Sequence, residues 1–375
     1  MGYTQQNFLA GQILKASQLI AMEDGILANE ASIALCDVGL RVGEAAGSIE
    51  QTEFYIEQGT QRVPGAIASG SGAIAFGGQR YDKAGDPEEE EPRTQAKGIQ
   101  SFAAGGGVIV EGAWSVGFGK DTKTYQKAAF VSGGGCIAGC TEEEYTTYAS
   151  VIKASTNTNT YENSYSLAHA EGDNSKARGN AAHAEGRKTD ALGFCAHAEG
   201  NETAATGQFS HTEGFCTKTG RFNEDGTIEV AGSAAHAEGR NTEALGTASH
   251  AEGESTTSIG TNSHTEGYKT TANGENSHAG GYECQTKGTN SFAHGKGLII
   301  TKNNGAVFGQ YNDGGTHIFA VGMGTGLTAR KNVLAINDNG DLFIYHPGKK
   351  ALYSLSQLLA AVGAFEKVTP IKQYT

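Results

Sequence analysis

The sequence predicts a mainly β fold, a parallel β-roll built from 14-residue repeats, on three observations. Histidines recur every 14 residues in two runs, His169 to His211 and His236 to His278. Glycines recur every seven residues from Gly172 to Gly207. The 375 residues include 55 Gly and only 8% aromatic residues, so large side chains for a thick globular core are scarce. A thin solenoid of stacked repeats fits this composition.

Each repeat is interpreted as two short strands that end at glycine, where the chain must bend. In the stretch 182–186, Ala-His-Ala-Glu-Gly, alternation places the small residues on one face and His183 with Glu185 on the other. The second strand would offer a matching small face at Thr189, Ala191 and Gly193. Two facing sheets of small residues predict a narrow interior with no room for a ligand.

The outward positions of the second strand vary from repeat to repeat. They include Asp190, Leu192, Glu243 and Leu245. Free variation of this kind is typical of a solvated surface, so we expect these side chains to face water.

Earlier turns carry aromatic residues where later turns carry His and Glu, in the stretches 101–105, 115–119 and 129–133. A position that holds Phe in some turns should be buried, yet one thin roll cannot bury both faces of a sheet. We therefore expect copies of the chain to cover this face in a symmetric homo-oligomer. The residues expected at the interface are His169, Glu171, His183, Glu185, His197, Glu199, His211, Glu213, His236, Glu238, His250, Glu252, His264, Glu266, Phe102, Phe118 and Phe130.

These repeats resemble the head repeat of trimeric autotransporter adhesins of the YadA type, loosely over residues 66–140 and closely over 164–297. The resemblance implies a left-handed roll and a homotrimer. The form Ala-His-Ala-Glu-Gly more closely resembles repeats of phage and prophage tail-appendage proteins. Residues 8–26 are similar to the opening segment of many tail-fibre and baseplate-attached proteins, and residues 306–312, 318–322 and 332–344 look like their post-roll segment.

Autotransporter adhesins need a secretion signal and a membrane-anchoring barrel segment, and neither is recognisable in this sequence. The resemblance therefore implies a structural virion protein, a phage tail-fibre or receptor-binding component assembled in the host cytoplasm. A bacterial surface adhesin at the cell surface is the alternative. The implied partners are two further copies of the chain, other tail or baseplate proteins, and a glycan or protein of the host surface.

The formal net charge of −13 argues against a nucleic-acid partner, because nucleic acids attract clustered Lys and Arg. No apolar stretch is long enough for a transmembrane helix, so membrane insertion is not expected. The six cysteines are irregularly spaced and are expected to be free thiols.

His and Glu two residues apart on a strand are a ligand set for a transition metal. Catalytic groups, however, form a single constellation in a cleft, whereas this pair repeats about seven times on a flat sheet. A structural ladder is the preferred interpretation, and metal binding by the ladder stays open.

No nucleophile elbow, phosphate loop or zinc-protease motif is present, so we expect no enzyme, no catalytic residue and no cofactor. A receptor contact would use exposed aromatic residues, although any of them can equally serve packing. The candidates are Tyr161, Tyr165, Phe222, Tyr268 and Tyr282.

The predicted organisation has six segments. They are an N-terminal attachment or trimerisation segment (1–65) with a helix at 16–28, a first roll (66–140) with an acidic loop at 86–92, a helical interruption (141–163), a second roll (164–297), a post-roll β domain (298–350) and a C-terminal helix and tail (351–375).

Three local signals refine these segments. Thr141 and Glu144 form a capping-box pattern, so a helix is predicted from there to about Ala154. Residues 221–230 read as an inserted hairpin that turns at Asp225-Gly226, and residues 338–341 mark a second hairpin turn. The apolar stretch 351–365 predicts the closing helix.

Overall fold

The structure is a computed structural model that describes residues 40–42, 49–51, 53–55, 62–64, 66–78, 94–152, 161, 166–315 and 317–361. The helix expected at 16–28 and the acidic loop at 86–92 lie outside these residues. The described part is mainly β, with about 15 turns of parallel β-solenoid and few helices. It divides into two compact units, Met1–Lys123 and Thr124–Thr375.

The first unit stacks strands in two parallel sheets, with β2, β6, β8 and β10 in one and β5, β7 and β9 in the other. Antiparallel pairs join β1 to β2 and β3 to β4. The strands are β1 (Leu40–Val42), β2 (Ile49–Gln51), β3 (Glu53–Tyr55), β4 (Arg62–Pro64), β5 (Ile67–Ala68), β6 (Ile74–Gly78), β7 (Gln95–Ala96), β8 (Phe102–Gly106), β9 (Ile109–Val110) and β10 (Val116–Lys120), with β11 (Lys123–Thr124) at the boundary.

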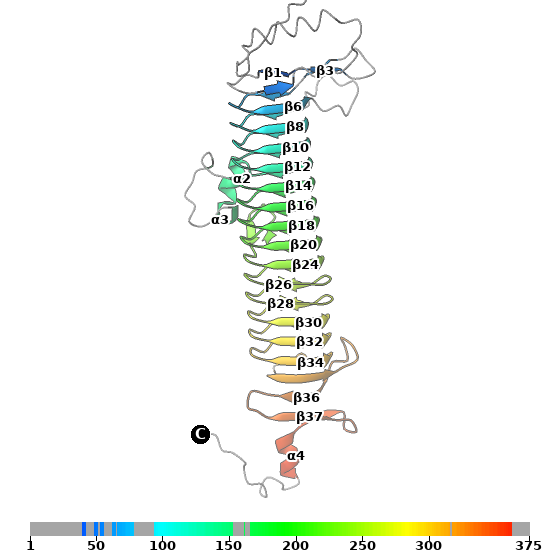
Figure 1. The fold of residues 1–375 in the computed structure, drawn as a ribbon. Coiled ribbons are helices and arrows are strands. Elements are labelled where there is room, and N and C mark those ends of the chain that lie inside the picture. Colours follow the sequence, from blue (N-terminus) through cyan, green and yellow to red (C-terminus); the bar gives the residue numbers. More distant parts are fainter. Residues whose placement is uncertain are drawn as a thin grey trace, which may run out of the picture. The chain divides into compact units, whose positions relative to one another are not determined.

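In the second unit the first strand of every turn lies on one sheet, with successive strands stacked in parallel (Figure 1). The register pairs each residue with its equivalent, so that His169 lies beside His183 and His183 beside His197. The strands are β12 (Phe130–Gly134), β14 (His169–Asp173), β16 (His183–Arg187), β18 (His197–Asn201), β20 (His211–Phe215), β24 (His236–Arg240), β26 (His250–Ala251), β28 (His264–Thr265), β30 (His278–Tyr282), β32 (Phe292–Lys296), β34 (Ala306–Gln310) and β35 (Phe319–Met323).

The second strand of each turn is only two residues long and joins a second parallel sheet. These strands are β13 (Ile137–Ala138), β15 (Lys176–Ala177), β17 (Asp190–Ala191), β19 (Ala204–Ala205), β21 (Lys218–Thr219), β25 (Glu243–Ala244), β27 (Thr257–Ser258), β29 (Thr271–Ala272), β31 (Gln285–Thr286) and β33 (Ile299–Ile300).

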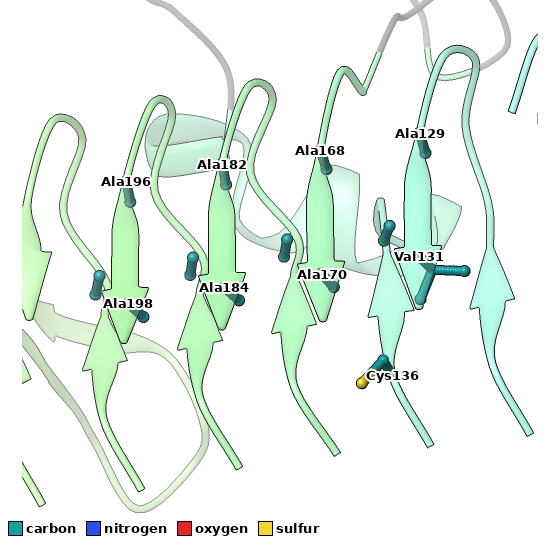
Figure 2. Packing of buried hydrophobic residues seen from close by; sticks show 13 residues of the cluster. Ala129, Val131, Cys136, Ala168, Ala170, Ala182, Ala184, Ala196 and Ala198 are labelled. Atoms are coloured by element: carbon teal, nitrogen blue, oxygen red, sulfur yellow. The ribbon is translucent and has the colours of Figure 1, made fainter. Parts of the chain in front are cut away.

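Small side chains fill the space between the two sheets, as predicted. Ala182 and Ala184 of the first sheet and Ala191 of the second are at most 1% exposed. Figure 2 shows the same arrangement in successive coils, where alanines repeat and Val131 and Cys136 join the cluster beside Ala129. A core of this kind is one or two side chains thick, so ligands and functional groups can only be carried on its outer faces.

Glycine is required where successive backbones touch. A Cβ atom on Gly193 would lie 1.9 Å from the carbonyl oxygen of Gly207 in the next coil. Gly186 meets the same obstacle and also has a positive φ of 112°, which L-residues rarely adopt. The seven-residue glycine spacing therefore reflects contact between coils as well as bending.

Two insertions lie against each other on the second unit. The first is α2 (Glu142–Thr147) and α3 (Ala149–Ile152), and the capping box of Thr141 and Glu144 is confirmed. The expected single helix is divided at Tyr148, and its expected end near Ala154 lies outside the described residues. The second is the hairpin of β22 (Arg221–Phe222) and β23 (Ile228–Val230), which turns at Asp225-Gly226 as predicted. The Tyr148 hydroxyl donates to the Gly226 carbonyl, at 3.2 Å.

One expectation about the outer face is wrong. Leu192 and Leu245, expected at a solvated surface, are only 1% and 3% exposed. Leu192 packs in a cluster with Tyr145 and Ile152 of the helical insertion. Arg178 holds the same insertion to the roll, because its guanidinium binds Glu144 of α2 and Asp190 of β17.

Parallel pairing continues past residue 297, through β33 and β34 to β35. Antiparallel strands then end the sheet, with β36 (Asn332–Ile336) and β37 (Leu342–His346) joined by the predicted turn. The closing helix expected from residue 351 begins later, because β38 (Ala351–Ser354) pairs with β37 before α4 (Leu355–Ala361) starts.

The five cysteines among the described residues are free thiols, in line with the prediction, and Cys36 lies outside those residues. Burial raises the pKa of the Cys140 thiol to about 12, so this group is an inert part of the packing around α2. Within the described ranges, every helix is too short or too polar to cross a membrane.

The glycine contact between coils predicts a position-specific effect on stability. Replacing Gly193 by Ala forces its Cβ against the Gly207 backbone, and overpacking of this kind costs about 2–3 kcal/mol. Urea unfolding of Gly193→Ala should show this loss. The matched control is Gly134→Ala, where a Cβ would find nothing closer than 4.0 Å, and its loss should stay within about 0.5 kcal/mol. Equal losses in both variants would contradict the packing role.

Candidate functional site

Two columns of side chains run along the outer face of the first sheet of the second unit. In-register stacking builds both, because equivalent residues of successive coils are paired. The imidazole column is His169, His183, His197, His211, His236, His250, His264 and His278. The carboxylate column is Glu171, Glu185, Glu199, Glu213, Glu238, Glu252 and Glu266.

The imidazole rings are stacked face to face. From His169 to His264, successive ring centroids lie 4.7–4.9 Å apart and the ring planes differ by at most 16°. This separation matches the spacing of neighbouring strands, so the backbone sets it. The ring of His278 departs from the stack, at 62° to that of His264.

Six imidazoles place their Nε2 atom within 4.0 Å of a glutamate oxygen, those of His169, His183, His211, His250, His264 and His278. The Nε2 atoms of His211 and His264 lie 3.3 Å from an oxygen of Glu199 and Glu252, respectively, in the preceding coil. Six Nε2 atoms are closed off from solvent and make no well-directed hydrogen bond within the described residues, those of His169, His183, His197, His236, His250 and His264. Four of them, in His169, His183, His250 and His264, still lie 3.3–4.0 Å from a glutamate oxygen. An unsatisfied buried polar atom costs about 1–3 kcal/mol, so this face is incomplete in a single chain.

Several imidazoles have a pKa below the ordinary histidine value. Burial is the largest cause for His169, His197, His236 and His278, and the neighbouring imidazoles of the column lower the pKa further. The adjacent glutamates act in the opposite direction and only partly offset these causes. The fold therefore favours the neutral form of these rings.

Aromatic residues continue the imidazole column at both of its ends within the second unit. Phe130 packs edge-on against His169, with ring centroids 4.8 Å apart. At the other end Phe292 follows His278 in the imidazole column, and Phe308 follows His294 in the carboxylate column, with its ring 5.4 Å from that of Phe292. Phe308 remains 40% exposed. The first unit has a row of its own, in which Phe102 lies between Phe76 and Phe118.

A broad groove of about 450 Å³ lies along the carboxylate column. It is lined by Ser132, Glu171, Gly172, Glu185, Gly186, Glu199 and Gly200. The groove is open to solvent and acidic, and it exposes glycine backbone beside the glutamates. It offers a long concave surface rather than an enclosed pocket for a small molecule.

The predicted receptor-contact residues fall in three different places. Tyr161 is half-buried, and its hydroxyl donates to the Cys140 carbonyl, so it packs the helical insertion. Phe222 is 39% exposed and lies edge-on to Tyr148. Tyr165 lies outside the described residues.

Tyr268 and Tyr282 are brought together by the register. Their rings stack with centroids 5.1 Å apart, and Lys269 and Lys296 lie over the two ring faces. The ammonium groups are attracted to the ring faces by cation–π interaction, so the four side chains form one cluster.

The residues missed by sequence reasoning lie where the repeat changes. Gly280 stands where a glutamate is expected, and His294 stands one coil later in the same column. His278 belongs to the 14-residue spacing but was not assigned to the interface. The departure of 278–281, His-Ala-Gly-Gly, from the repeated His-Ala-Glu-Gly was the available signal.

No family model matches this chain, and no curated protein matches it.

The chemistry of the columns allows proton uptake, hydrogen bonding to a covering surface and metal ligation. Five or more groups of three His and Glu residues have their donor atoms within 4.8 Å of one another. Three of these groups hold a single imidazole beside two glutamates, whereas His169 with His183 and His278 with His294 each supply two imidazoles. A covering surface with hydrogen-bonding groups would satisfy such an array best.

The lowered pKa values predict loss of stability in acid. Between the folded pKa and about 6.5 the unfolded chain binds more protons, so the free energy of unfolding should fall as the pH drops below about 6.5. Urea unfolding at pH 7.5 and pH 5.5 measures the drop. This drop in the free energy of unfolding should be smaller in the double variant His197→Gln, His236→Gln, which removes two imidazoles with a lowered pKa.

The control for this experiment is His317→Gln, because His317 pairs with Asp313 outside the two columns. This variant should lose as much stability in acid as the unchanged protein. A drop of the same size in the double variant would contradict the assignment to the imidazole column.

Proposed function

We propose that this chain is a structural protein of a phage tail, a trimeric tail-fibre or receptor-binding component that attaches the virion to the bacterial host. One observation carries the proposal. The outer face of the first sheet combines solvent-excluded imidazole nitrogens that lack a hydrogen bond with exposed aromatic side chains. A second surface must cover such a face for the polar atoms to be satisfied and the apolar area to be buried.

The covering surface is best supplied by further copies of the same chain. Every turn presents the same face, so a copy with the same repeat spacing matches it over many turns. Closed symmetry about an axis parallel to the stacking direction of the coils would place equivalent columns in contact. The number of copies and the left-handed sense of the coils rest on the resemblance of residues 66–140 and 164–297 to YadA-type heads.

The acidic groove supports the same arrangement. Its glycine floor allows another backbone to approach closely, and its glutamates can accept hydrogen bonds from the imidazoles of a neighbouring chain. Polar contacts between repeats would then fix the register of the chains, while the aromatic residues supply the buried apolar area.

Attachment to the host is assigned to the outer surface that the trimer leaves free. Tyr268, Tyr282, Lys269 and Lys296 form the best candidate there, and a host-surface glycan with acidic groups fits them. Other tail or baseplate proteins would hold the fibre, in a virion assembled in the host cytoplasm. The proposal includes no catalytic step.

A trimeric adhesin on the bacterial surface is the second candidate, and the same repeat resemblance favours it. Both proposals require a trimer, but they place it differently. Antibodies against the purified chain should label the tails of phage particles in electron micrographs. Labelling of the bacterial envelope in cells that make no phage would favour the adhesin instead.

The trimer proposal predicts a particle of three 38.9 kDa chains in sedimentation equilibrium. Phe308→Gln should shift the equilibrium toward single chains, because it removes apolar area from the proposed interface. The matched control Ile259→Gln changes a side chain of similar exposure, 44%, on the other sheet and should leave the trimer intact. A well-folded single chain in the unchanged protein would refute the proposal.

The receptor proposal predicts a separate defect. In a host strain that adsorbs the phage, the purified protein should compete with adsorption, and the variant Tyr268→Ala, Tyr282→Ala should compete at least tenfold less well while remaining a trimer. Loss of two stacked aromatic contacts is the physical reason. Phe222→Ala is the control on another surface. If the double variant competes with adsorption as well as the unchanged protein does, these two tyrosines do not form the receptor contact.

A further inference from the structure

The two columns end at one irregular turn of the second unit, where the side chains of Glu266, His278 and His294 converge. Glu266, Gly280 and His294 occupy the carboxylate column in three successive coils, and His278 ends the regular imidazole column. The Nε2 atom of His278 and the Nδ1 atom of His294 each lie 3.3 Å from the same Glu266 oxygen, Oε1. The three donor atoms lie within 4.8 Å of one another.

Gly280 makes this convergence possible. A Cβ atom at this position would lie 2.5 Å from His294 Nδ1 and 2.7 Å from Glu266 Oε1. The missing side chain therefore leaves the space into which both groups lean. A glutamate here, as in every preceding turn from Glu171 to Glu266, would fill that space.

The ring of His278 has also turned toward this point. It lies at 62° to His264, whereas the preceding rings differ by at most 16°. In the regular group of His169, Glu171 and His183 the two rings are parallel and their nitrogens point the same way. Only around Gly280, among the described turns, do imidazoles from both columns meet one carboxylate.

We propose that Glu266, His278 and His294 form a binding site for one divalent transition-metal ion, with Zn²⁺ as the metal that fits best. Two imidazole nitrogens and one carboxylate oxygen are a recurrent zinc ligand set, whereas Ca²⁺ and Mg²⁺ prefer oxygen ligands alone. Zinc bonds of about 2.0–2.1 Å place tetrahedral ligand atoms about 3.4 Å apart, close to the two separations of 3.3 Å.

Solvent reaches this site in the single chain. His294 is 51% exposed, which gives an ion a route to the site from solvent. Three protein ligands leave a fourth position for water or for a group of another chain.

A bound ion would tie three successive coils together at the turn where the polar columns give way to the aromatic residues Phe292 and Phe308. Each ligand comes from a different coil, so the ion would resist separation of those coils. The inference goes beyond the attachment role, and it uses residues of one chain, so it holds whether or not the chain forms trimers.

Zinc titration of the full-length protein against a chromophoric chelator tests the site. One Zn²⁺ per chain is expected, and His294→Ala should weaken binding at least tenfold. Gly280→Ala should also weaken zinc binding although it removes no ligand, because its methyl group occupies the space between Glu266 and His294. The matched control His169→Ala alters a regular His–Glu–His group and should bind zinc like the unchanged protein.

Circular dichroism establishes that each variant is folded, and half-exposed His294 is a safe site for substitution if Gly280→Ala disturbs the coil. Co²⁺ gives a second readout, since tetrahedral coordination yields strong visible absorption that His294→Ala should abolish. Unchanged zinc affinity in His294→Ala would overturn the proposal. So would several equivalent ions per chain that His169→Ala reduces as much as His294→Ala does, because binding would then belong to the whole array.

Discussion

The in-register stacking of parallel coils is the constraint on which the rest of this structure depends. Backbone hydrogen bonds between turns place each residue beside its equivalent, so any repeated side chain becomes a column with the strand spacing. The glycines keep this contact close, since a Cβ on Gly193 or Gly207 would strike the backbone of the next coil. Composition, core and surface all follow from that closeness, because only small side chains fit between the sheets.

In-register stacking brings identical ionisable side chains of neighbouring coils next to each other along the sheet. Identical carboxylates one strand apart repel each other, and identical imidazoles do so once protonated. The offset between the two columns relieves this, because His211 and His264 reach the glutamate of the preceding coil. An isolated chain still leaves several Nε2 atoms without a hydrogen bond. The face is therefore polar, and its hydrogen bonding is incomplete within one chain.

Departures from the repeat hold the features that a uniform solenoid cannot provide. The helical insertion and the inserted hairpin lie outside the roll, where Tyr148 contacts both Phe222 and Gly226 and covers part of the second sheet. The exchange of glutamate for Gly280 turns a regular column into a convergent group of three ligands. The regular repeat fixes the spacing of the side chains, whereas the single exception at Gly280 brings the groups of the proposed metal site together.

The sequence by itself determined the strands, the small-residue core, the adjacent His and Glu columns, the cap at Thr141 and the two hairpin turns, because each depends on near neighbours or on a fixed period. Tertiary structure alone decided the burial of Leu192, the division of the helix at Tyr148, the strand at Ala351–Ser354 and the meeting of Glu266 with His294. These features arise from contacts between residues distant in sequence or from the rotation of one ring, and periodicity carries no information about either.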